Sequence, residues 1–363
     1  MRGIAAVVTG GGKTIFALNC IGKAQPRKPL IVVPTTALAD QWADEAAAHF
    51  NLQVEDIHFP SSKWDLKHGT INIGTMQSLS RNVDESIIDA DVLVVDECHR
   101  IASPEYRKIL NISAKVRLGL SATPNRQYDD GLSDVLIPGL GSVIYNYGYK
   151  EAKDDGVIVD FILRNILFNL EVDRQNEFDR LTKRIIVCSN KFGDSSPEVV
   201  KLLLQRSRVN NQSPTRVELA AKIAARHVLN KTIVFLEDIE SSRATKAVLE
   251  MLNIKASLYH SELSRSERID AIRSYRSGCC NTIIACRALD EGFNAPETEV
   301  AIIAASSATV RQRVQRLGRT LRPSPGKDVA VIYTLASTKS EVARLVEEED
   351  SYKSISQIEW YRS

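Results

Sequence analysis

The sequence predicts an α/β protein with two doubly wound parallel-sheet domains. Short, nearly continuous apolar runs rich in β-branched residues alternate with helical stretches, as expected for parallel strands buried on both faces. This alternation occurs twice, on either side of a charged helical stretch, which indicates two sheets rather than one. The length of 363 residues suits two domains and a connector.

The first domain is predicted at residues 1–149. A helix is expected over 36–50, because Leu38, Trp42 and Ala46 recur at helical spacing. The apolar runs interpreted as strands are 3–8, 29–34, 54–59, 70–75, 91–97 and 116–123. Strands separated by helices in this way form βαβ units, and hence a doubly wound parallel sheet.

The second domain is predicted at 216–346, after a connector at 150–215. The connector contains two charged, amphipathic stretches at 176–185 and 198–207, which are interpreted as a helical pair. The strands predicted in the second domain are 231–237, 255–260, 281–286, 300–305 and 328–335, and the helices are 241–253, 265–276 and 310–321. Residues 347–363 form a tail to which no structure is assigned.

Composition and charge narrow the class of protein. Apolar residues make up 44% and charged residues 25%, with a formal net charge of +2, so any nucleic-acid site must be a local basic patch. The six cysteines form no CxxC pair, which argues against zinc or a disulfide framework. No apolar run approaches the roughly 20 residues that span a bilayer. We therefore expect a soluble, intracellular protein without a signal peptide or membrane partner, cytoplasmic or, in a eukaryote, nuclear.

A glycine-rich segment follows the first predicted strand and opens a helix. It consists of Thr9, Gly10, Gly11, Gly12, Lys13 and Thr14. Glycines let backbone N–H groups surround an anion at a helix N-terminus, where Lys13 can reach β- and γ-phosphates and the Thr14 hydroxyl can bind Mg²⁺. Val7 stands where the strict phosphate-loop pattern has its first glycine. A simple turn between strand and helix is the alternative.

Acidic and small polar residues follow two later strands. A carboxylate at the carboxyl end of a parallel strand faces the ligand crevice of the sheet. Asp96 is suited to hold Mg²⁺ through water, Glu97 to polarise the attacking water, and His99 to sense the γ-phosphate or the second domain. Ser121 and Thr123 end the next strand, a position where small hydroxyl residues are also common without a function.

A basic helix is predicted near the end of the second domain. Arg316, Arg319 and Arg322 are three residues apart, hence on one face if the helix runs through Gly318. Arginines on such a face are suited to act as fingers on a γ-phosphate in phosphoryl transfer. A solvated basic helix is the alternative. Upstream, residues 290–296 form a Gly- and Pro-containing loop after a predicted strand, again on the ligand side of a sheet.

The order of these motifs resembles that of superfamily 2 helicases of the DExH-box type. The matching segments, from about Gly3 to Leu335, are GGGKT, PTTALADQW, DECH, SATP, IVFLEDIESS, IIACRALDEGFNAP and QRLGRTLRP. The last two forms, together with YHSELSRSER, are most similar to XPB-like and RadD-like DNA helicases and translocases. The resemblance implies two RecA-like domains that share one ATP site at their interface, with ATP and Mg²⁺ as cofactors.

The resemblance also implies a role for each matching residue. Catalysis is expected from Lys13, Asp96, Glu97, Gln315, Arg319 and Arg322, and Mg²⁺ ligation from Thr14 and Asp96. Nucleotide contacts are expected from the segment Thr9–Thr14 and from Asp96, His99, Gly292 and Asn294. Nucleic-acid contacts are expected from Pro34, Thr35, Thr75, Cys286 and Arg287, and coupling between the sites from Ser121 and Thr123.

Three departures from the family pattern concern single contacts. Cys286 replaces a common threonine, and Asn294 replaces a common aspartate near the ribose. Only Met1 and Arg2 precede the first strand. We therefore expect the adenine-reading glutamine of the family to be missing and GTP to be used within about tenfold of ATP, because nothing then discriminates between the purine bases.

The expected function is that of an ATP-dependent DNA helicase or translocase in repair or recombination. DNA rather than RNA is the expected partner, and a protein partner is expected to supply specificity or strand separation. Two alternatives stay open: a DExH-type RNA helicase, and a scaffold that binds nucleic acid under ATP control with weak hydrolysis. The intact Glu97 and the pair of arginines argue against the scaffold.

Overall fold

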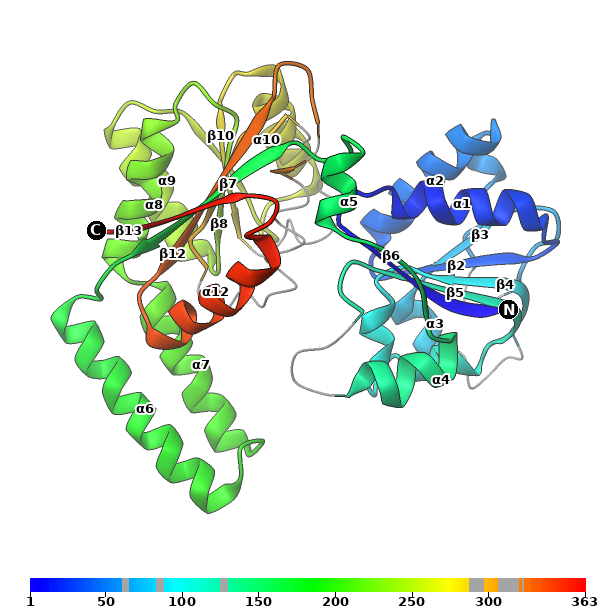
Figure 1. The fold of residues 1–363 in the computed structure, drawn as a ribbon, viewed down its shortest axis with the longest axis horizontal. Helices are drawn as coiled ribbons and strands as arrows, with labels where there is room; N and C mark the ends of the chain where they lie inside the picture. The colour runs from blue at the N-terminus through cyan, green and yellow to red at the C-terminus, as the bar shows by residue number, and fades with distance from the viewer. Residues whose placement is uncertain (61–64, 83–87, 125–129, 287–296, 306–319, 322) are drawn as a thin grey trace. The chain divides into compact units, whose positions relative to one another are not determined.

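The computed structural model describes residues 1–60, 65–82, 88–124, 130–286, 297–305, 320–321 and 323–363. Within these residues the chain forms two compact units, Met1–Val157 and Ile158–Ser363. Each unit contains one twisted sheet with helices around it (Figure 1). All strand pairs in both sheets are parallel, so the predicted fold class of two parallel α/β domains is confirmed.

The first sheet has six strands in the order β3-β2-β4-β5-β1-β6. The strands are β1 (Arg2–Val7), β2 (Pro29–Val33), β3 (Asn72–Thr75), β4 (Asp89–Val95), β5 (Ser113–Ser121) and β6 (Val143–Tyr147). The helices are α1 (Lys13–Ala24), α2 (Thr36–Phe50), α3 (Met76–Asn82), α4 (Ile137–Leu140) and α5 (Tyr149–Asp154).

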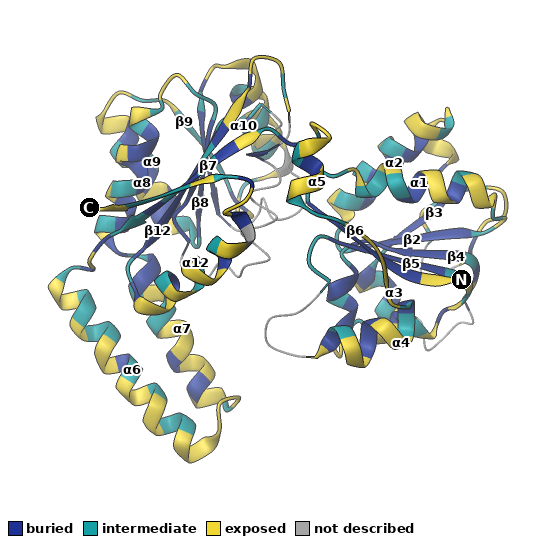
Figure 2. Cartoon of the chain, viewed as in Figure 1, coloured by how far each residue is buried: buried dark blue, intermediate teal, exposed yellow. Residues whose placement is uncertain are grey.

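Alternate residues of each inner strand of this sheet pack on opposite faces. In β4, Val92 and Val94 pack with residues of α1 and α2, whereas Leu93 and Val95 pack with residues of α3 and α4. A strand that is apolar on both faces must be covered on both, which is why these runs show continuous rather than alternating hydrophobicity. Figure 2 shows the resulting pattern of buried strands and helices with exposed outer faces.

One predicted strand of the first unit is wrong. Residues 54–59 contain a short 3₁₀ helix, Val54–Asp56, followed by a single bridge between His58 and Asn72. The Asp56 carboxylate accepts a hydrogen bond from the backbone N–H of Gln53 at 3.1 Å. This local side-chain bond competes with a strand ladder and favours a turn. Conversely, the edge strand β6 was not predicted, because its exposed position does not produce a buried apolar run.

The second sheet has seven strands in the order β13-β7-β12-β11-β8-β10-β9. The strands are β7 (Asp160–Leu167), β8 (Thr232–Leu236), β9 (Ala256–Tyr259), β10 (Thr282–Cys286), β11 (Val300–Ile303), β12 (Val329–Ala336) and β13 (Gln357–Arg362). The helices are α6 (Val172–Phe192), α7 (Pro197–Asn211), α8 (Pro214–Arg226), α9 (Ile239–Met251), α10 (Arg265–Ser277) and α12 (Lys339–Tyr352). The predicted helix 310–321 lies outside the described residues, except for its last two.

Two strands of the second sheet lie in segments that the sequence did not assign to it. β7 lies within 150–215, the predicted connector, where α6 and α7 supply the expected helical pair. β13 lies within 347–363, the unassigned tail, and pairs only with β7. Both strands join the sheet through pairing between distant parts of the chain, which no local pattern reveals. The limits 1–149, 150–215, 216–346 and 347–363 stay a prediction.

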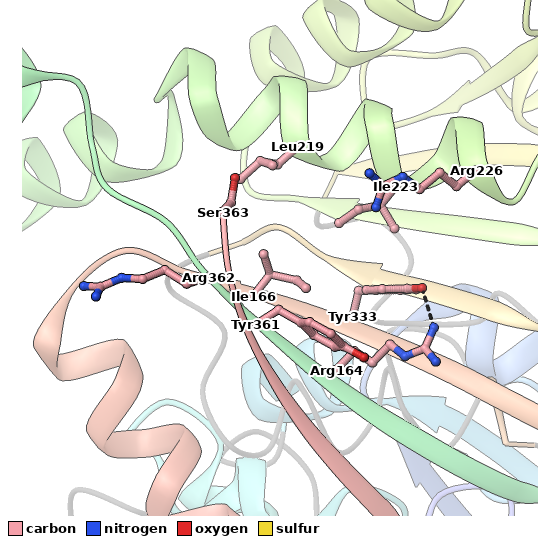
Figure 3. Close-up of a pocket in the computed structure, with 9 residues that line it drawn as sticks. All are labelled: Arg164, Ile166, Leu219, Ile223, Arg226, Tyr333, Tyr361, Arg362 and Ser363. Atoms are coloured by element: carbon pink, nitrogen blue, oxygen red, sulfur yellow. Dashed lines mark hydrogen bonds between the residues drawn. The ribbon is translucent and has the colours of Figure 1, made fainter.

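A row of polar side chains crosses β13, β7 and β12, and Figure 3 shows its Arg164–Tyr333 part. The strand register places Glu359 beside Arg164, and Arg164 beside Tyr333. Arg164 donates from Nε to Glu359 at 2.7 Å and from Nη1 to the Tyr333 hydroxyl at 2.9 Å. The row therefore connects the edge strand β13, through β7, to β12. The position of β12 in the sheet is set by its own apolar core.

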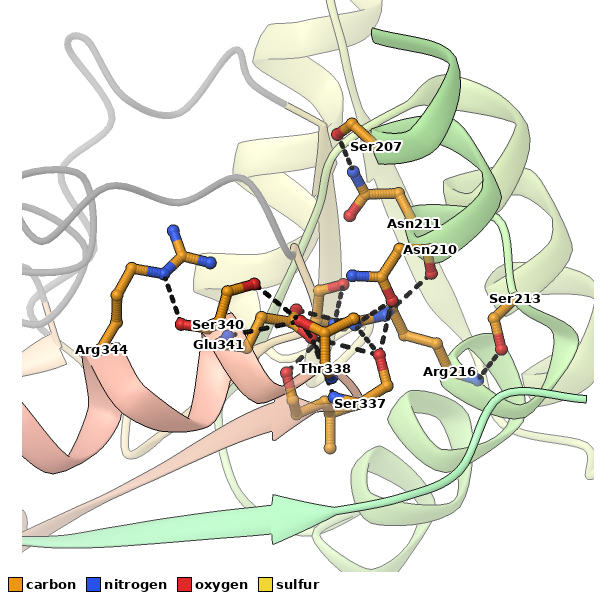
Figure 4. Close-up of polar contacts among 12 residues, drawn as sticks. Ser207, Asn210, Asn211, Ser213, Arg216, Ser337, Thr338, Ser340, Glu341 and Arg344 are labelled. Carbon is orange, nitrogen blue, oxygen red and sulfur yellow. Dashed lines mark hydrogen bonds and ion pairs between the residues drawn. The ribbon is translucent and has the colours of Figure 1, made fainter. Parts of the chain in front are cut away.

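A fully buried arginine, Arg216 on α8, connects the elements around the carboxyl ends of β11 and β12 (Figure 4). Its guanidinium pairs with Glu341 of α12 at 2.9 Å and lies 5.0 Å from the centre of the Phe168 ring. Further acceptors of its N–H groups are the backbone carbonyls of Asn210, Ala304 and Leu335 and the side chains of Asn210 and Ser337. Because a buried charge is tolerated only when its donors are satisfied, Arg216 is a structural residue.

Candidate functional site

The candidate site lies at the carboxyl edge of the first sheet. The strands are parallel, so their carboxyl ends meet at this one edge. The register aligns Ala6 of β1 with Ser121 of β5, and Val95 of β4 with Gly119 of β5. The segments that follow β1 and β4 and the end of β5 are therefore brought together, as expected for the ligand crevice of an open α/β sheet.

The glycine-rich segment is a tight loop that leads directly into α1. Gly12 caps α1 with φ 79° and ψ 28°, a left-handed conformation that favours glycine. A Cβ on Gly11 would lie 2.9 Å from Cγ1 of Val7 and 3.0 Å from the Val8 carbonyl oxygen, so no side chain fits there. Gly10 has a φ of 90°, so each of the three glycines lies at a position of the loop that favours glycine. The absence of a glycine at position 7 does not prevent this turn.

The side chains of this loop are placed for binding an anion. Lys13 is the first residue of α1, and its Nζ donates to the carbonyl oxygen of Val7 at 3.4 Å, next to the loop. The Thr9 hydroxyl is buried and has no hydrogen-bond partner among the described residues. Free N–H groups at a helix N-terminus, a lysine and an unsatisfied hydroxyl are the donors that a phosphate group requires.

Asp96 is held in a fixed orientation beside this loop. It is 6% exposed. One carboxylate oxygen accepts from the indole Nε1 of Trp42 at 2.9 Å, and the other accepts from the backbone N–H of Glu97, also at 2.9 Å. The sequence pattern identified Trp42 only as a core residue of α2. The signal that could have revealed its second role is that a buried indole N–H needs an acceptor.

Glu97 has a strained backbone and begins a chain of side-chain contacts. Its φ of 47° and ψ of 48° are left-handed, which costs of order 1–3 kcal/mol for a non-glycine residue and is typical of functional sites. Its carboxylate lies 3.4 Å from Nδ1 of the buried His99, and that nitrogen lies 2.9 Å from the Ser121 hydroxyl. The Ser121 hydroxyl also accepts from the backbone N–H of Thr123 at 3.1 Å. The acidic segment and the end of β5 are therefore connected.

The predicted nucleic-acid contacts of the first unit lie on the same edge. Thr35 caps α2 by accepting from the Leu38 N–H at 3.4 Å, and Thr75 accepts from the Ser78 N–H at 3.2 Å at the start of α3. Register pairs Thr75, the last residue of β3, with Val33, the last residue of β2, so both threonines lie at the carboxyl ends of neighbouring strands. Pro34, Thr35 and Thr75 are partly exposed. Their capping bonds show that both hydroxyls also have a structural role.

The predicted residues of the second unit are only partly described. Cys286 ends β10 and is 6% exposed, so its thiol has little surface to offer a ligand. The remaining predicted residues of this unit lie outside the described residues: Arg287, Gly292, Asn294, Gln315, Arg319 and Arg322. Among the described residues no group of three or more His, Cys, Asp or Glu side chains is arranged to hold a metal ion. The described helices include none that is long and apolar enough to cross a membrane.

Two family models match this chain. One, described as "Type III restriction enzyme, res subunit", matches residues 1–126, and the other, "Helicase conserved C-terminal domain", matches residues 215–324. Together the two matches cover more than half of the chain. They include the loop, Asp96, Glu97 and Ser121 in the first unit, and most of the second parallel sheet.

Several curated proteins that match the chain are named as DNA helicases or translocases. A putative DNA 3'-5' helicase Rad25 of Haloarcula marismortui is 26% identical, over 92% of this chain and 50% of its own length. The DNA 3'-5' translocase XPB2 of Sulfurisphaera tokodaii is 28% identical, over 88% of this chain and 75% of its own length. The DNA 3'-5' helicase XPB of Mycobacterium tuberculosis is 22% identical, over 93% of this chain and 58% of its own length. The chain thus spans from half to three-quarters of the length of these relatives.

Solved structures share the fold of both units. Dbp5 of S. cerevisiae bound to RNA and ADP BeF3 matches with a TM-score of 0.62 and 13% identity, over 99% of this chain and 85% of that one. The ATP-dependent Type ISP restriction-modification enzyme LlaBIII bound to DNA matches with a TM-score of 0.68 and 15% identity, over 99% of this chain and 30% of that one. The fold therefore defines the class, a protein with two RecA-like α/β domains in tandem.

The family follows from the matched motifs and models. The chain belongs to the superfamily 2 helicases, and its XPB-named and Rad25-named relatives are distant homologues.

Proposed function

We propose that this protein is an ATP-driven DNA helicase or translocase. The observation that carries the proposal is the meeting of the phosphate-binding loop, the fixed Asp96 and the Glu97–His99–Ser121 contacts at one sheet edge. The curated relatives are named as DNA 3'-5' helicases and translocases, which supports DNA rather than RNA as the partner. Repair or recombination is the process we propose for it. A DExH-type RNA helicase is the second candidate, favoured by the shared fold of the RNA-bound Dbp5.

The residues of the site suit the hydrolysis of ATP. We propose that the N-terminus of α1, Thr9 and Lys13 bind the phosphates, and that Thr14 and Asp96 hold Mg²⁺. When bound, Mg²⁺ neutralises charge that develops on the phosphates. Glu97 orients the attacking water and accepts its proton. The unpartnered Thr9 hydroxyl and the fixed Asp96 carboxylate are the features of this structure that fit these ligands.

We propose that the second domain completes the ATP site and part of the DNA track. Gln315, Arg319 and Arg322, with Gly292 and Asn294, are assigned to ATP by their motifs alone. Arg287 and Cys286 are assigned to DNA on the same basis, although the burial of Cys286 leaves mainly its backbone for such a contact. On the first domain, Pro34, Thr35 and Thr75 are the proposed DNA contacts. Alternation between ATP-closed and open states would convert hydrolysis into stepping.

The proposed function predicts an ATPase that DNA stimulates. We expect single-stranded or duplex DNA to raise the ATP turnover number by at least about tenfold, and RNA to do so less. Affinity for DNA should fall steeply with salt and depend little on sequence, because phosphates carry the contacts. The measurement is steady-state ATPase with single-stranded DNA, duplex DNA, branched DNA and RNA. Stimulation by RNA alone would favour the second candidate, and ATP turnover indifferent to every nucleic acid would contradict both.

The Ser121 hydroxyl is expected to couple hydrolysis to movement. Ser121→Ala removes the contact with His99 and with the Thr123 N–H but leaves Glu97 and the phosphate loop intact. Loss of these contacts should lower the amount of DNA movement per ATP hydrolysed, while hydrolysis itself is retained. We expect ATP turnover without DNA to change by less than about twofold. Strand displacement or translocation is measured beside ATPase. Ser113→Ala, an exposed change at the other end of β5, is the control, and equal loss of both activities would contradict coupling.

A further inference from the structure

A pocket of about 420 Å³ lies in the second unit between α8 and the end of the sheet formed by β13, β7 and β12 (Figure 3). Its volume is within the range of small-molecule sites. Apolar side chains line one part of it, namely Ile166 of β7 and Leu219 and Ile223 of α8. Three arginines line it, Arg164 of β7, Arg226 of α8 and Arg362 of β13, of which Arg164 and Arg226 lie on opposite walls. The phosphate loop belongs to the first unit, so this pocket is a separate feature of the chain.

The acidic residue nearest to Arg164 is already fully used. One oxygen of Glu359 accepts from Arg164 at 2.7 Å and from the Tyr361 hydroxyl at 2.6 Å, and the other accepts from the Gln357 amide at 2.7 Å. The Tyr361 hydroxyl, followed by Arg164, keeps the pKa of the Glu359 carboxyl below its usual range. Glu359 therefore fixes Arg164 and the Tyr361 ring, and three hydrogen bonds already use most of the acceptor capacity of its carboxylate.

Arg226 contributes an uncompensated positive charge. Among the described residues it forms no ion pair, and the pocket is lined by no Asp or Glu side chain. Glu299, the other acid near this wall, accepts from the Asn230 amide at 3.1 Å and from the Lys231 N–H at 2.9 Å. Burial lowers the pKa of His227, and the charges of Arg164 and Arg226 lower it further, whereas the hydrogen bond with Asn230 and the charge of Glu299 act in the opposite direction.

Among the polar groups that line the pocket, the Tyr333 hydroxyl already has hydrogen-bond partners. The Tyr333 hydroxyl accepts from Arg164 at 2.9 Å and lies 2.9 Å from Nε2 of His227, to which it can donate when the imidazole is neutral. Tyr361 is 46% exposed, and its ring is held in place through its hydroxyl. A ligand would therefore find a fixed aromatic ring, apolar side chains and two guanidinium groups with spare N–H donors.

We propose that this pocket binds a nucleoside phosphate, with the base against Tyr361 and the apolar side chains, and the phosphate between Arg164 and Arg226. Two guanidinium groups offer more donors than the two oxygens of one carboxylate can accept, whereas a terminal phosphate has three oxygens. A base gains about 1–3 kcal/mol by stacking on an aromatic side chain. The same chemistry is offered by a free nucleotide and by the phosphorylated end of a strand. If the ligand is the phosphorylated end of a strand, the pocket would be a further DNA contact of the proposed helicase or translocase, and this case rests on the proposed function.

The test uses the full-length chain and AMP, inorganic phosphate and two short oligodeoxynucleotides, one with and one without a 5'-phosphate. AMP lacks the β- and γ-phosphates proposed for Lys13, so Lys13→Ala should leave AMP binding unchanged. Arg226→Glu should weaken AMP binding at least about tenfold, with Arg226→Lys intermediate, and Tyr361→Ala should weaken AMP but not inorganic phosphate. Arg180→Glu makes the same charge change at an exposed site on α6, away from the lining of the pocket, and should have no effect. Calorimetry gives the dissociation constants.

The probes distinguish a free nucleotide from a strand end as the ligand, and they distinguish failure of this proposal from failure of the proposed function. Tighter binding of the 5'-phosphorylated oligonucleotide than of AMP, sensitive to Arg226→Glu, identifies a strand end, and the reverse order identifies a free nucleotide. The proposal is overturned if neither probe binds, if Arg226→Glu has no effect, or if inorganic phosphate binds as tightly as AMP. DNA-stimulated ATPase of the parent protein is measured in parallel. If the pocket proposal fails while DNA still stimulates ATP hydrolysis, only the pocket proposal is wrong. If AMP binds as predicted but DNA does not stimulate hydrolysis, only the proposed function is wrong.

Discussion

Replacing Glu97 by glutamine is expected to lower the turnover number for ATP by about 10²–10⁴, the usual contribution of a positioned general base. The change keeps the size of the side chain and leaves the backbone conformation accessible. It removes the negative charge that lies 3.4 Å from Nδ1 of His99 and is proposed to accept a proton from water. The affinity for ATP should change by less than about threefold, because the phosphate-loop donors are untouched. Turnover at saturating DNA and ATP binding are measured separately.

Glu105→Gln is the matched control for this experiment, because Glu105 is an exposed acid in the same unit. Its turnover number should equal that of the parent. A Glu97→Gln protein that hydrolyses ATP within a factor of about three of the parent would remove Glu97 from the mechanism. A comparable loss of ATP affinity and turnover would instead indicate a role in binding.

Replacing Arg216 by methionine is expected to destabilise the second unit by about 3–5 kcal/mol, as when one partner of a buried ion pair is lost. The substitution leaves the Glu341 carboxylate and the acceptors on Asn210 and Ser337 buried without their charged donor. It also removes the contact with the face of the Phe168 ring. Denaturant unfolding followed by circular dichroism measures the free energy of unfolding.

The pH dependence of this loss provides a second readout. Burial alone would raise the pKa of Glu341, but the charge of Arg216 and the N–H groups of Ser337 and Thr338 outweigh it, so the pKa lies below 4.5. A lowered folded-state pKa means that the stabilisation is present above pH 4.5 and is lost as the pH falls through the folded-state value. The deficit of Arg216→Met should therefore be greatest near neutral pH and shrink in acid.

Two further variants identify the cause of the destabilisation. Lys222→Met removes an exposed cation from the same helix and should cost less than about 1 kcal/mol. The double variant Arg216→Met with Glu341→Met removes both charges and should recover a part of the loss, since no buried carboxylate is left unpaired. A loss below about 1 kcal/mol in Arg216→Met, or no recovery in the double variant, would show that the pair is not the source of stability.

Much of the first sheet was predictable because its inner strands are covered on both faces. The run Val92–Val95 is continuously apolar for that reason, and the structure places it in β4. Segment 54–59 failed because a local bond between Asp56 and Gln53 competes with pairing. β7 and β13 were missed because their place is set by pairing with each other and with β12. A strand at the edge of a sheet needs no long apolar run, so periodicity gives it no distinct signal.

The sequence alone determined the fold class, the glycine-rich loop before α1 and the order of the motifs, because turn glycines and apolar runs act over a few neighbours. Only the tertiary structure decided that Trp42 holds Asp96, and that His99 and Ser121 connect the acidic segment to β5. It alone joined Arg164 to Glu359, and Arg216 to Glu341. These contacts are between residues far apart in the chain, and each requires that burial remove water, so that a hydrogen bond left unmade becomes costly.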